Sequence, residues 1–138
     1  MSEEPKYSLD DLEPYQAARE FRKKIYRLVK LLPASERYCL EKQMRRAAAS
    51  ITNNIAEGHG RWHVQENIQF CRVARGSIEE IIDDINICTD ENYAAEQLLS
   101  ELKSGAYQLI HRLNGYVAYL RNTHRCRKAV VCDRRRIA

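Results

Sequence analysis

Apolar residues recur along this chain at alternating spacings of three and four, which gathers side chains on one face of an α-helix. The first such stripe consists of Ala18, Phe21, Ile25, Leu28 and Leu32. We expect its helix to begin near Asp10 or Pro14, since aspartate caps exposed amide groups and proline suits a first turn. The helix should end before Pro33, because proline disfavours a helical conformation in the residue that precedes it.

A second stripe follows a short corner at residues 33–36. In that corner Ser35 can cap the next helix, and the negative charge of Glu36 suits the helix N-terminus. The stripe consists of Leu40, Met44, Ala47, Ala48, Ile51 and Ile55. Gly58 and Gly60 follow it and predict the end of the second helix.

Two further stripes keep the heptad spacing of a bundle seam. The third consists of Ile68, Cys71, Ala74, Ile78, Ile81, Ile82, Ile85 and Cys88. The fourth consists of Leu99, Leu102, Ala106, Leu109, Leu113, Tyr116 and Leu120. Four stripes with short connections predict an all-α fold, an antiparallel up-and-down four-helix bundle. We expect the bundle to span residues 12–121, after a flexible segment at 1–11 and before a basic tail at 122–138.

Three glycines fall inside the third and fourth predicted helices, at Gly76, Gly105 and Gly115. Each costs about 1 kcal/mol relative to alanine in a helix interior. We interpret them as positions where two helices cross closely, in preference to positions where a ligand approaches the backbone.

Composition agrees with a single helical core. The chain has 138 residues, of which 44% are apolar and 30% charged, with only 5 glycines and 3 prolines. No apolar run approaches the roughly 20 residues that cross a bilayer, and the first residues are acidic, unlike a secretory signal. We therefore expect a cytoplasmic protein with no membrane partner.

Candidate chemistry is sparse. The five cysteines form an odd set without zinc-ligand spacing, which argues against a disulfide framework. His59 and His63 are four residues apart, but glycines interrupt the helix between them and no H-E-x-x-H pattern is present. The acidic pairs 79–80 and 83–84 indicate a solvated face, and no phosphate loop or nucleophile elbow occurs. We predict no enzyme activity, no metal and no cofactor.

Basic residues suggest a ligand more strongly. Residues 121–138 carry seven basic side chains and one acidic side chain, whereas residues 1–120 carry 16 basic and 18 acidic ones. A second basic group lies around the end of the second helix, where Trp62 or His63 could stack on a base. The candidate nucleic-acid contacts are Arg45, Arg46, Arg61, Arg72, Arg75, Arg121, Arg125, Arg127, Lys128, Arg134, Arg135 and Arg136. Two alternatives stay open: Arg46 and Arg61 fasten the corner through acids such as Glu57, and the tail arginines only keep the tail soluble.

The run from Gln43 to Arg61 closely resembles the signature of a bacterial family of four helix bundle proteins. That family includes proteins encoded in intervening sequences of 23S ribosomal RNA genes. The stretches 74–80 and 90–93 also resemble it, so the likeness covers about residues 12–121. The chain is similar, more distantly, to the accessory variability protein of diversity-generating retroelements, which works with a reverse transcriptase and RNA.

The resemblance implies a homopentamer that binds structured nucleic acid, with RNA preferred, alongside a reverse transcriptase or ribosomal RNA. The signature residues that map onto this chain are Arg46, Asn54, Glu57, Gly58 and Arg61. Their chemistry indicates a polar network at the corner between the second and third helices. The chain departs from the family pattern at Thr52, often a proline there, and at Trp62. The alternative function is an oligomeric protein-interaction scaffold that uses the acidic face of the third helix or an apolar outer stripe.

Overall fold

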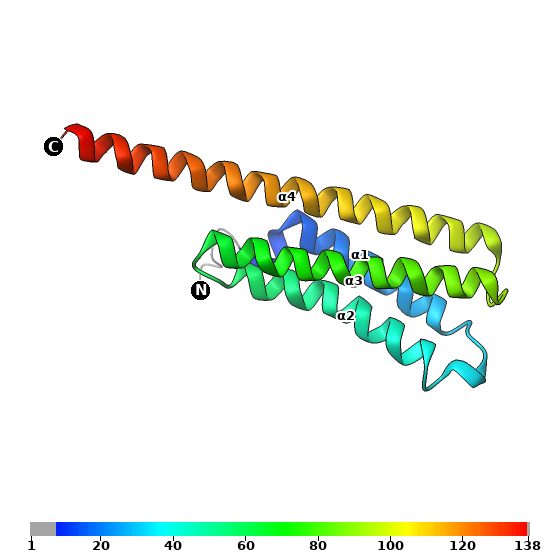
Figure 1. Cartoon of the computed structure of the whole chain (residues 1–138). Coiled ribbons are helices and arrows are strands. Elements are labelled where there is room, and N and C mark those ends of the chain that lie inside the picture. The colour runs from blue at the N-terminus through cyan, green and yellow to red at the C-terminus, as the bar shows by residue number, and fades with distance from the viewer. Residues whose placement is uncertain (1–7, 138) are drawn as a thin grey trace.

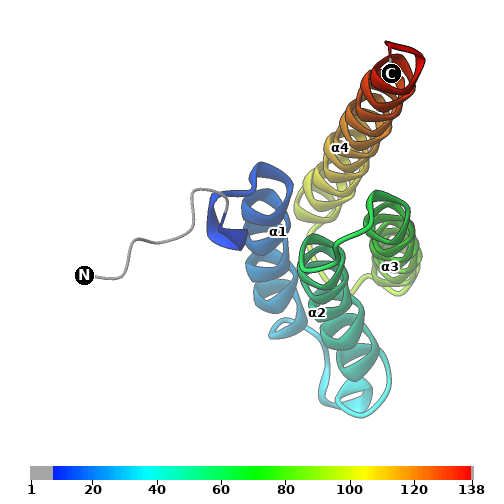
Figure 2. The ribbon, with the colours of Figure 1, turned by 90° about the vertical axis from the view of Figure 1, so that its left-hand side faces the viewer.

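The computed structural model describes residues 8–137, which form a bundle of four α-helices (Figure 1). The elements in chain order are a 3-10 turn η1 (Leu9–Asp11), α1 (Glu13–Val29), a 3-10 turn η2 (Ala34–Glu36), α2 (Leu40–His59), α3 (Val64–Asp90) and α4 (Glu96–Ile137). Consecutive helices run antiparallel and pack side by side (Figures 1 and 2). The described residues contain no strand, so the predicted all-α fold is confirmed. None of the described helices is long and apolar enough to cross a membrane.

The four apolar stripes build the core, and of their buried residues only Ile68 and Leu120 lie outside its main cluster. All members of the first three stripes are buried, and in the fourth stripe only Tyr116 is partly exposed. Tyr116 keeps its hydroxyl at the edge of the core, where it accepts a hydrogen bond from Nδ2 of Asn67 at 3.2 Å. Because Asn67 lies near the start of α3 and Tyr116 near the middle of α4, this bond sets how the two helices align.

The corner between α1 and α2 differs from the expected Ser35 cap. The turn η2 is followed by α2 starting at Leu40, and Oε2 of Glu36 accepts a hydrogen bond from the Leu40 amide at 3.2 Å. Oε1 of the same carboxylate accepts a bond from the Tyr93 hydroxyl at 3.1 Å, which ties this corner to the α3–α4 loop. The predicted Ser35 cap is therefore wrong, since the longer Glu36 side chain reaches the free amide.

Glycines divide into two kinds. A Cβ atom at Gly58 would lie 2.7 Å from Oδ1 of Asn67, so this glycine marks a close approach of α2 and α3. A Cβ atom at Gly76 or Gly115 would meet nothing within 4 Å, and one at Gly105 would make only ordinary contact with the Phe21 ring. The predicted close crossings at Gly76 and Gly115 are wrong, because a Cβ atom at either position would enter open space.

The basic tail continues α4 without a break to Ile137, and it projects past the end of the bundle (Figure 1). We call residues 122–137 the arm. At 1.5 Å per residue its 16 residues extend about 24 Å. Of the segment predicted to be flexible, residues 9–11 form the turn η1 and the first seven residues lie outside the described part.

Candidate nucleic-acid interface

Three of the predicted arginines meet in one hollow between α3 and α4. Arg72 and Arg75 come from α3, Arg121 comes from α4, and the cavity has a volume of about 290 Å³. Arg75 donates a hydrogen bond from Nη1 to Oδ1 of Asn114 at 3.1 Å, which fixes its guanidinium against α4. Arg121 lies 46 positions after Arg75 and 49 positions after Arg72 in the sequence. The antiparallel alignment of α3 and α4 brings the three arginines together.

The floor of this hollow is apolar and carries no negative charge. Cys71 and Leu113 are buried beneath the arginines, and Val117 is partly buried. Burial raises the pKa of the Cys71 thiol to about 11, so the thiol stays neutral at physiological pH. No carboxylate is among the residues that line the hollow. Three guanidinium groups over an uncharged floor form a site suited to a phosphate oxygen. The apolar floor has a low dielectric constant, so it screens the attraction between guanidinium and phosphate less than water does.

The basic surface continues from this hollow onto the arm. Arg121, His124, Arg125 and Lys128 follow one another at i, i+3, i+4 and i+7 and so share a helical face. His124 is half-buried, and Arg125 and Lys128 are exposed. The remaining predicted tail contacts lie on the same helix, outside the residues whose side chains the structure describes: Arg127, Arg134, Arg135 and Arg136. A track of basic side chains therefore runs along α4 from the bundle into the arm.

Two other predicted contacts point elsewhere. Arg61 forms an ion pair with Glu57 at 2.7 Å, and its guanidinium lies over the Phe70 ring at 5.1 Å. Arg45 pairs with Glu41 at 3.5 Å and lies over the Tyr26 ring at 5.1 Å, toward α1. Both arginines therefore serve packing contacts outside the α3–α4 hollow.

Arg46 lies on a third surface, between α2 and α3. It lines a hollow of about 440 Å³ together with Glu80, and its positive charge lowers the pKa of nearby Asp84 against the larger effect of burial. The sequence grouped this arginine with Arg72 and Arg75, but the structure places it among acids.

Asn54, another signature residue, is bonded within α2 and linked through Ser50 to α3. Asn54 donates from Nδ2 to the Ser50 carbonyl at 2.8 Å and to Oγ of Ser50 at 3.0 Å, which satisfies an amide inside a helix. Ser50 is in turn joined to Ser77 of α3 at 2.9 Å. The Glu57–Arg61 ion pair lies at the corner and the Asn54 and Ser50 bonds lie further along α2, so these signature residues have structural contacts at separate places and do not share one corner network.

Sequence reasoning missed Asn114, which positions Arg75, and His124, which lies in the track. Both share a face with Arg121 at helical spacing, so the polar outer face of α4 was the available signal. Trp62 lies in the α2–α3 loop, at the end of the bundle where the arm departs, and is 97% exposed.

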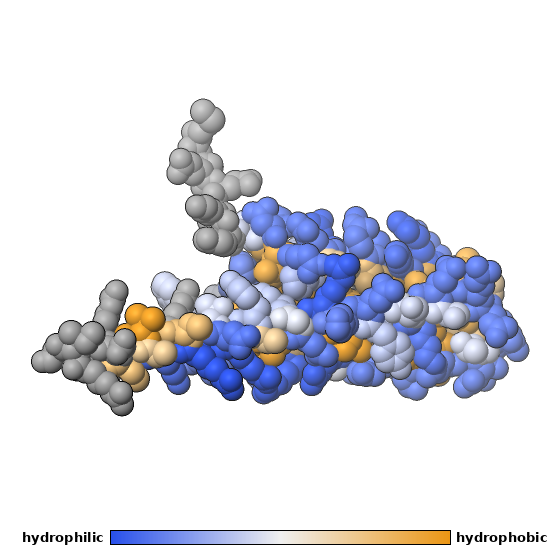
Figure 3. All heavy atoms as spheres, turned by 90° about the horizontal axis from the view of Figure 1, so that it is seen from above, coloured by the Kyte–Doolittle hydropathy of each residue, from blue (hydrophilic) through white to orange (hydrophobic). Residues whose placement is uncertain are grey.

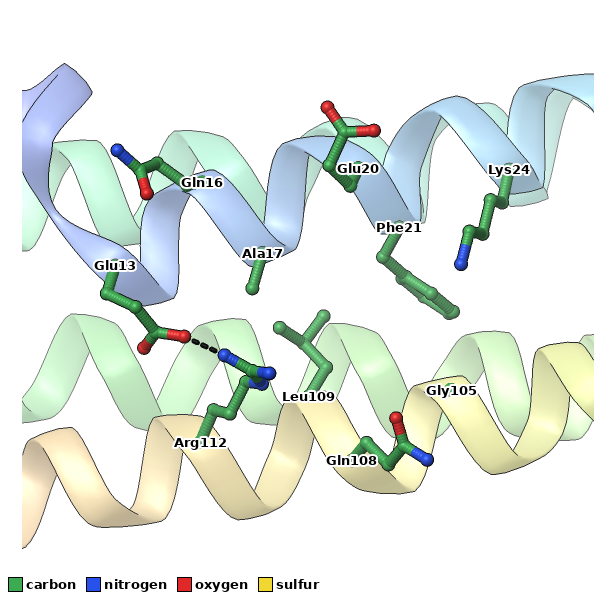
Figure 4. A pocket seen from close by; sticks show the side chains of 10 residues that line it. All are labelled: Glu13, Gln16, Ala17, Glu20, Phe21, Lys24, Gly105, Gln108, Leu109 and Arg112. Atoms are coloured by element: carbon green, nitrogen blue, oxygen red, sulfur yellow. Dashed lines mark hydrogen bonds and ion pairs between the residues drawn. The ribbon is translucent and has the colours of Figure 1, made fainter.

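A different hollow, between α1 and α4, contrasts with the α3–α4 hollow because carboxylates line it (Figure 4). There Arg112 points across the cavity to Glu13 and forms an ion pair with it. Glu20 also lines this hollow of about 340 Å³. The carboxylates compensate the basic side chains, so an anion gains little there.

Comparison with known proteins places this architecture in a family. The model of the family described as 23S rRNA-intervening sequence protein matches residues 10–115. The chain belongs to that family. A similar solved structure is a protein of unknown function from the S23 ribosomal protein family of Bacteroides thetaiotaomicron, with a TM-score of 0.70 at 18% identity. The alignment covers 75% of this chain and 97% of that one, which supports the shared fold. The chain matches none of the curated proteins.

The basic track of this chain extends past the limit of the family match. Arg72 and Arg75 lie inside the matched region, whereas Arg121 and the arm lie beyond residue 115. The three-arginine hollow therefore combines the family's bundle with a segment outside the matched region.

Proposed function

We propose that this protein is a non-enzymatic, homo-oligomeric accessory protein that binds structured nucleic acid, preferably RNA, through the α3–α4 hollow and the track beside it. One observation carries the proposal: three arginines from two helices line a single hollow that has no carboxylate. Arginine forks match phosphate oxygens, and neutralising phosphates releases counterions from the nucleic acid.

RNA is preferred over duplex DNA because of the exposed indole near the track. Sequence-specific or structure-specific RNA binding commonly uses aromatic side chains that stack on unpaired bases. Trp62, fully exposed at the same end of the bundle, suits such a role. The description of the family, which names an intervening sequence of 23S rRNA, supports ribosomal RNA as the context.

The finer proposals concern assembly and context. A pentamer and a reverse-transcriptase partner rest on the family resemblance of residues 43–61, and a cytoplasmic location suits an RNA ligand. The second candidate function is a protein-interaction scaffold. It is favoured by the stretch 76–102, which contains eight acidic residues and no lysine or arginine.

Removing two arginines of the hollow should weaken RNA binding and its dependence on salt. We expect R72Q/R75Q to lower affinity for a stem-loop RNA about tenfold or more at 0.1 M salt. The slope of log affinity against log salt should become shallower by about two, since each phosphate contact contributes roughly one. Fluorescence anisotropy over a salt series measures both quantities.

The matched control removes two positive charges at the far end of the bundle. R37Q/K42Q changes exposed residues of the α1–α2 corner and the first turn of α2, so its slope should stay close to that of the natural protein. No binding by the natural protein at low salt would overturn the proposed function. Equal losses in both double variants would show that net charge alone, and not the hollow, drives binding.

Trp62 is the only tryptophan of the chain, so its fluorescence reports directly on stacking. We expect quenching on addition of an RNA with unpaired loop bases. W62A should lower the affinity for that RNA about 5- to 150-fold, the range for one stacked base, and leave the slope of log affinity against log salt unchanged. Y38A removes another exposed aromatic at the opposite end and should have little effect. Unchanged Trp62 fluorescence at saturating RNA would contradict a stacking role.

A further inference from the structure

The arm presents an unpartnered surface. Val130 and Val131 are 53% and 50% exposed, and apolar side chains gather toward the far end of α4 (Figure 3). In the described part of the chain no other helix runs beside the arm (Figures 1 and 2). An unsupported helix of this length is only marginally stable in water. The arm extends the already formed helix α4 but gains no packing from another described helix, so a partner that covers its valines would stabilise it.

A matching surface lies between α2 and α3. The hollow there, about 440 Å³, is lined by Val73, Gly76 and Glu80 among others. Val73 is 45% exposed, and a Cβ atom at Gly76 would meet nothing within 4 Å, so an apolar side chain has room to enter. The exposed carboxylates of Glu79 and Asp83 lie on the same helix beside it.

Charge complementarity pairs these two surfaces. The stretch 76–102 carries eight acidic residues and no lysine or arginine, while residues 121–138 carry seven basic residues and one acidic residue. Around the hollow, the exposed carboxylates of Glu79, Glu80 and Asp83 outnumber the guanidinium of Arg46, which also lines it. The two surfaces therefore carry net charges of opposite sign, and each has exposed valine at its centre. Nucleic acid would satisfy the basic side chains of the arm but would leave the two valines exposed, so a protein surface is the better occupant.

The arm cannot reach this hollow within its own chain. It leaves the bundle at the end where α3 begins, and it points away from the other helices (Figure 1). Glu80 lies 16 residues after the start of α3, about 24 Å further along the bundle in the opposite direction. The complementary surface must therefore come from another molecule.

We propose that the arm of one copy docks head to tail in the α2–α3 hollow of a second copy. Val130 and Val131 cover Val73 and the space at Gly76, and Lys128 faces the carboxylate of Glu80. The inference rests on the homo-oligomeric part of the proposed function and names its contact. A head-to-tail contact of this kind is heterologous, so repeated copies build a ring or a filament.

Reciprocal charge reversal tests the contact in the absence of RNA. Sedimentation velocity of the full chain over a concentration series should show association of the natural protein. K128E or E80K alone should weaken it about tenfold, because each places like charges face to face. The double variant K128E/E80K should restore association, since the opposite charges again meet. E66K, at an exposed acid of α3 outside the hollow, is the matched control and should associate normally.

A second variant tests the apolar part of the contact between copies. V130S/V131S changes residues outside the bundle core, so the fold should persist while association weakens about tenfold or more. A natural protein that stays monomeric at all concentrations would overturn the proposal. Association lost on truncation after Arg121 but unaffected by E80K would also overturn it, since arms would then pair with each other. RNA binding is measured separately, on the E80K and R72Q/R75Q variants. If monomeric E80K still binds RNA and R72Q/R75Q does not, the RNA proposal holds whether or not the contact between copies does.

Discussion

Replacing Gly58 with alanine is expected to destabilise the protein by about 2 kcal/mol, although alanine is the better helix former. The added Cβ atom would lie 2.7 Å from Oδ1 of Asn67, 3.1 Å from its backbone oxygen and 3.0 Å from Cβ of Phe70. Two of these neighbours are a backbone atom and a Cβ atom, which move only if α3 moves. The overlap therefore outweighs the roughly 1 kcal/mol that alanine gains in helix propensity.

The side chain of Asn67 cannot simply turn away. Its Nδ2 donates to the Tyr116 hydroxyl at 3.2 Å, and its Oδ1 accepts from the Cys71 thiol at 3.7 Å. Asn67 is itself buried, so a lost partner leaves an unsatisfied polar group away from water. A displaced Asn67 would also disturb the alignment of α3 with α4 on which the arginine hollow depends.

Urea unfolding of G58A and G115A measures the effect with its control. Gly115 also lies inside a helix, but a Cβ atom there meets nothing within 4 Å, so G115A should stabilise the protein by about 0.5–1 kcal/mol. The two glycine-to-alanine changes should thus differ in sign. G58A matching or exceeding the natural protein in stability would show that α2 and α3 can separate there at little cost.

The helical faces were predictable because burial follows a local period. Every residue of the stripe from Ala18 to Leu32 is buried in the core, since a residue's face depends only on its spacing along one helix. The surroundings of the glycines were not predictable in this way. Gly58 was expected only to end α2, yet it marks a close approach of α2 and α3, because the contact depends on Asn67 of the next helix.

The candidate site was predictable only in part, for the same reason. Arg72 and Arg75 share a face at i, i+3 spacing, but nothing in the sequence joins them to Arg121. That meeting depends on the axial offset of α3 and α4, which the bond between Asn67 and Tyr116 fixes across 49 residues. Conversely, Arg45 and Arg46 are adjacent in the sequence and therefore point to different surfaces of α2. The basic tail was expected as a separate segment, whereas its helix-forming residues extend α4.

The buried carboxyl of Asp84 should make stability fall as pH rises, opposite to the usual trend for acids in ion pairs. Asp84 is 0% exposed, and Gln43 donates from Nε2 to its Oδ1 at 2.9 Å. Among the described residues its Oδ2 finds no hydrogen-bond partner. Burial raises the pKa of Asp84 from 3.8 to about 6, with repulsion from Asp83 and Glu80 adding to the effect and Arg46 opposing it.

The direction of the pH dependence follows from how tightly the folded and the unfolded protein hold the proton of Asp84. Because the folded protein holds this proton more tightly than the unfolded chain, the stabilisation is complete below about pH 4 and is lost as pH rises through about 6. A difference of about two pKa units corresponds to about 3 kcal/mol. Glu20 contributes in the opposite direction, since its hydrogen bond and charge interaction with Lys23 lower its pKa. The comparison between variants, and not the natural profile alone, isolates Asp84.

Urea unfolding of the natural protein and D84N from pH 4 to pH 8 tests this directly. Asparagine keeps the acceptor for Gln43 but cannot ionise, so the stability of D84N relative to the natural protein should rise by about 3 kcal/mol across this range. D83N is the matched control: it should keep the fall and lower its midpoint, because one repelling charge is gone. Parallel profiles for D84N and the natural protein would mean that Asp84 does not change charge over this range. The buried oxygen would then be satisfied or hydrated in solution, and the acidic surface on α3 would carry one more full negative charge toward the arm of a second copy.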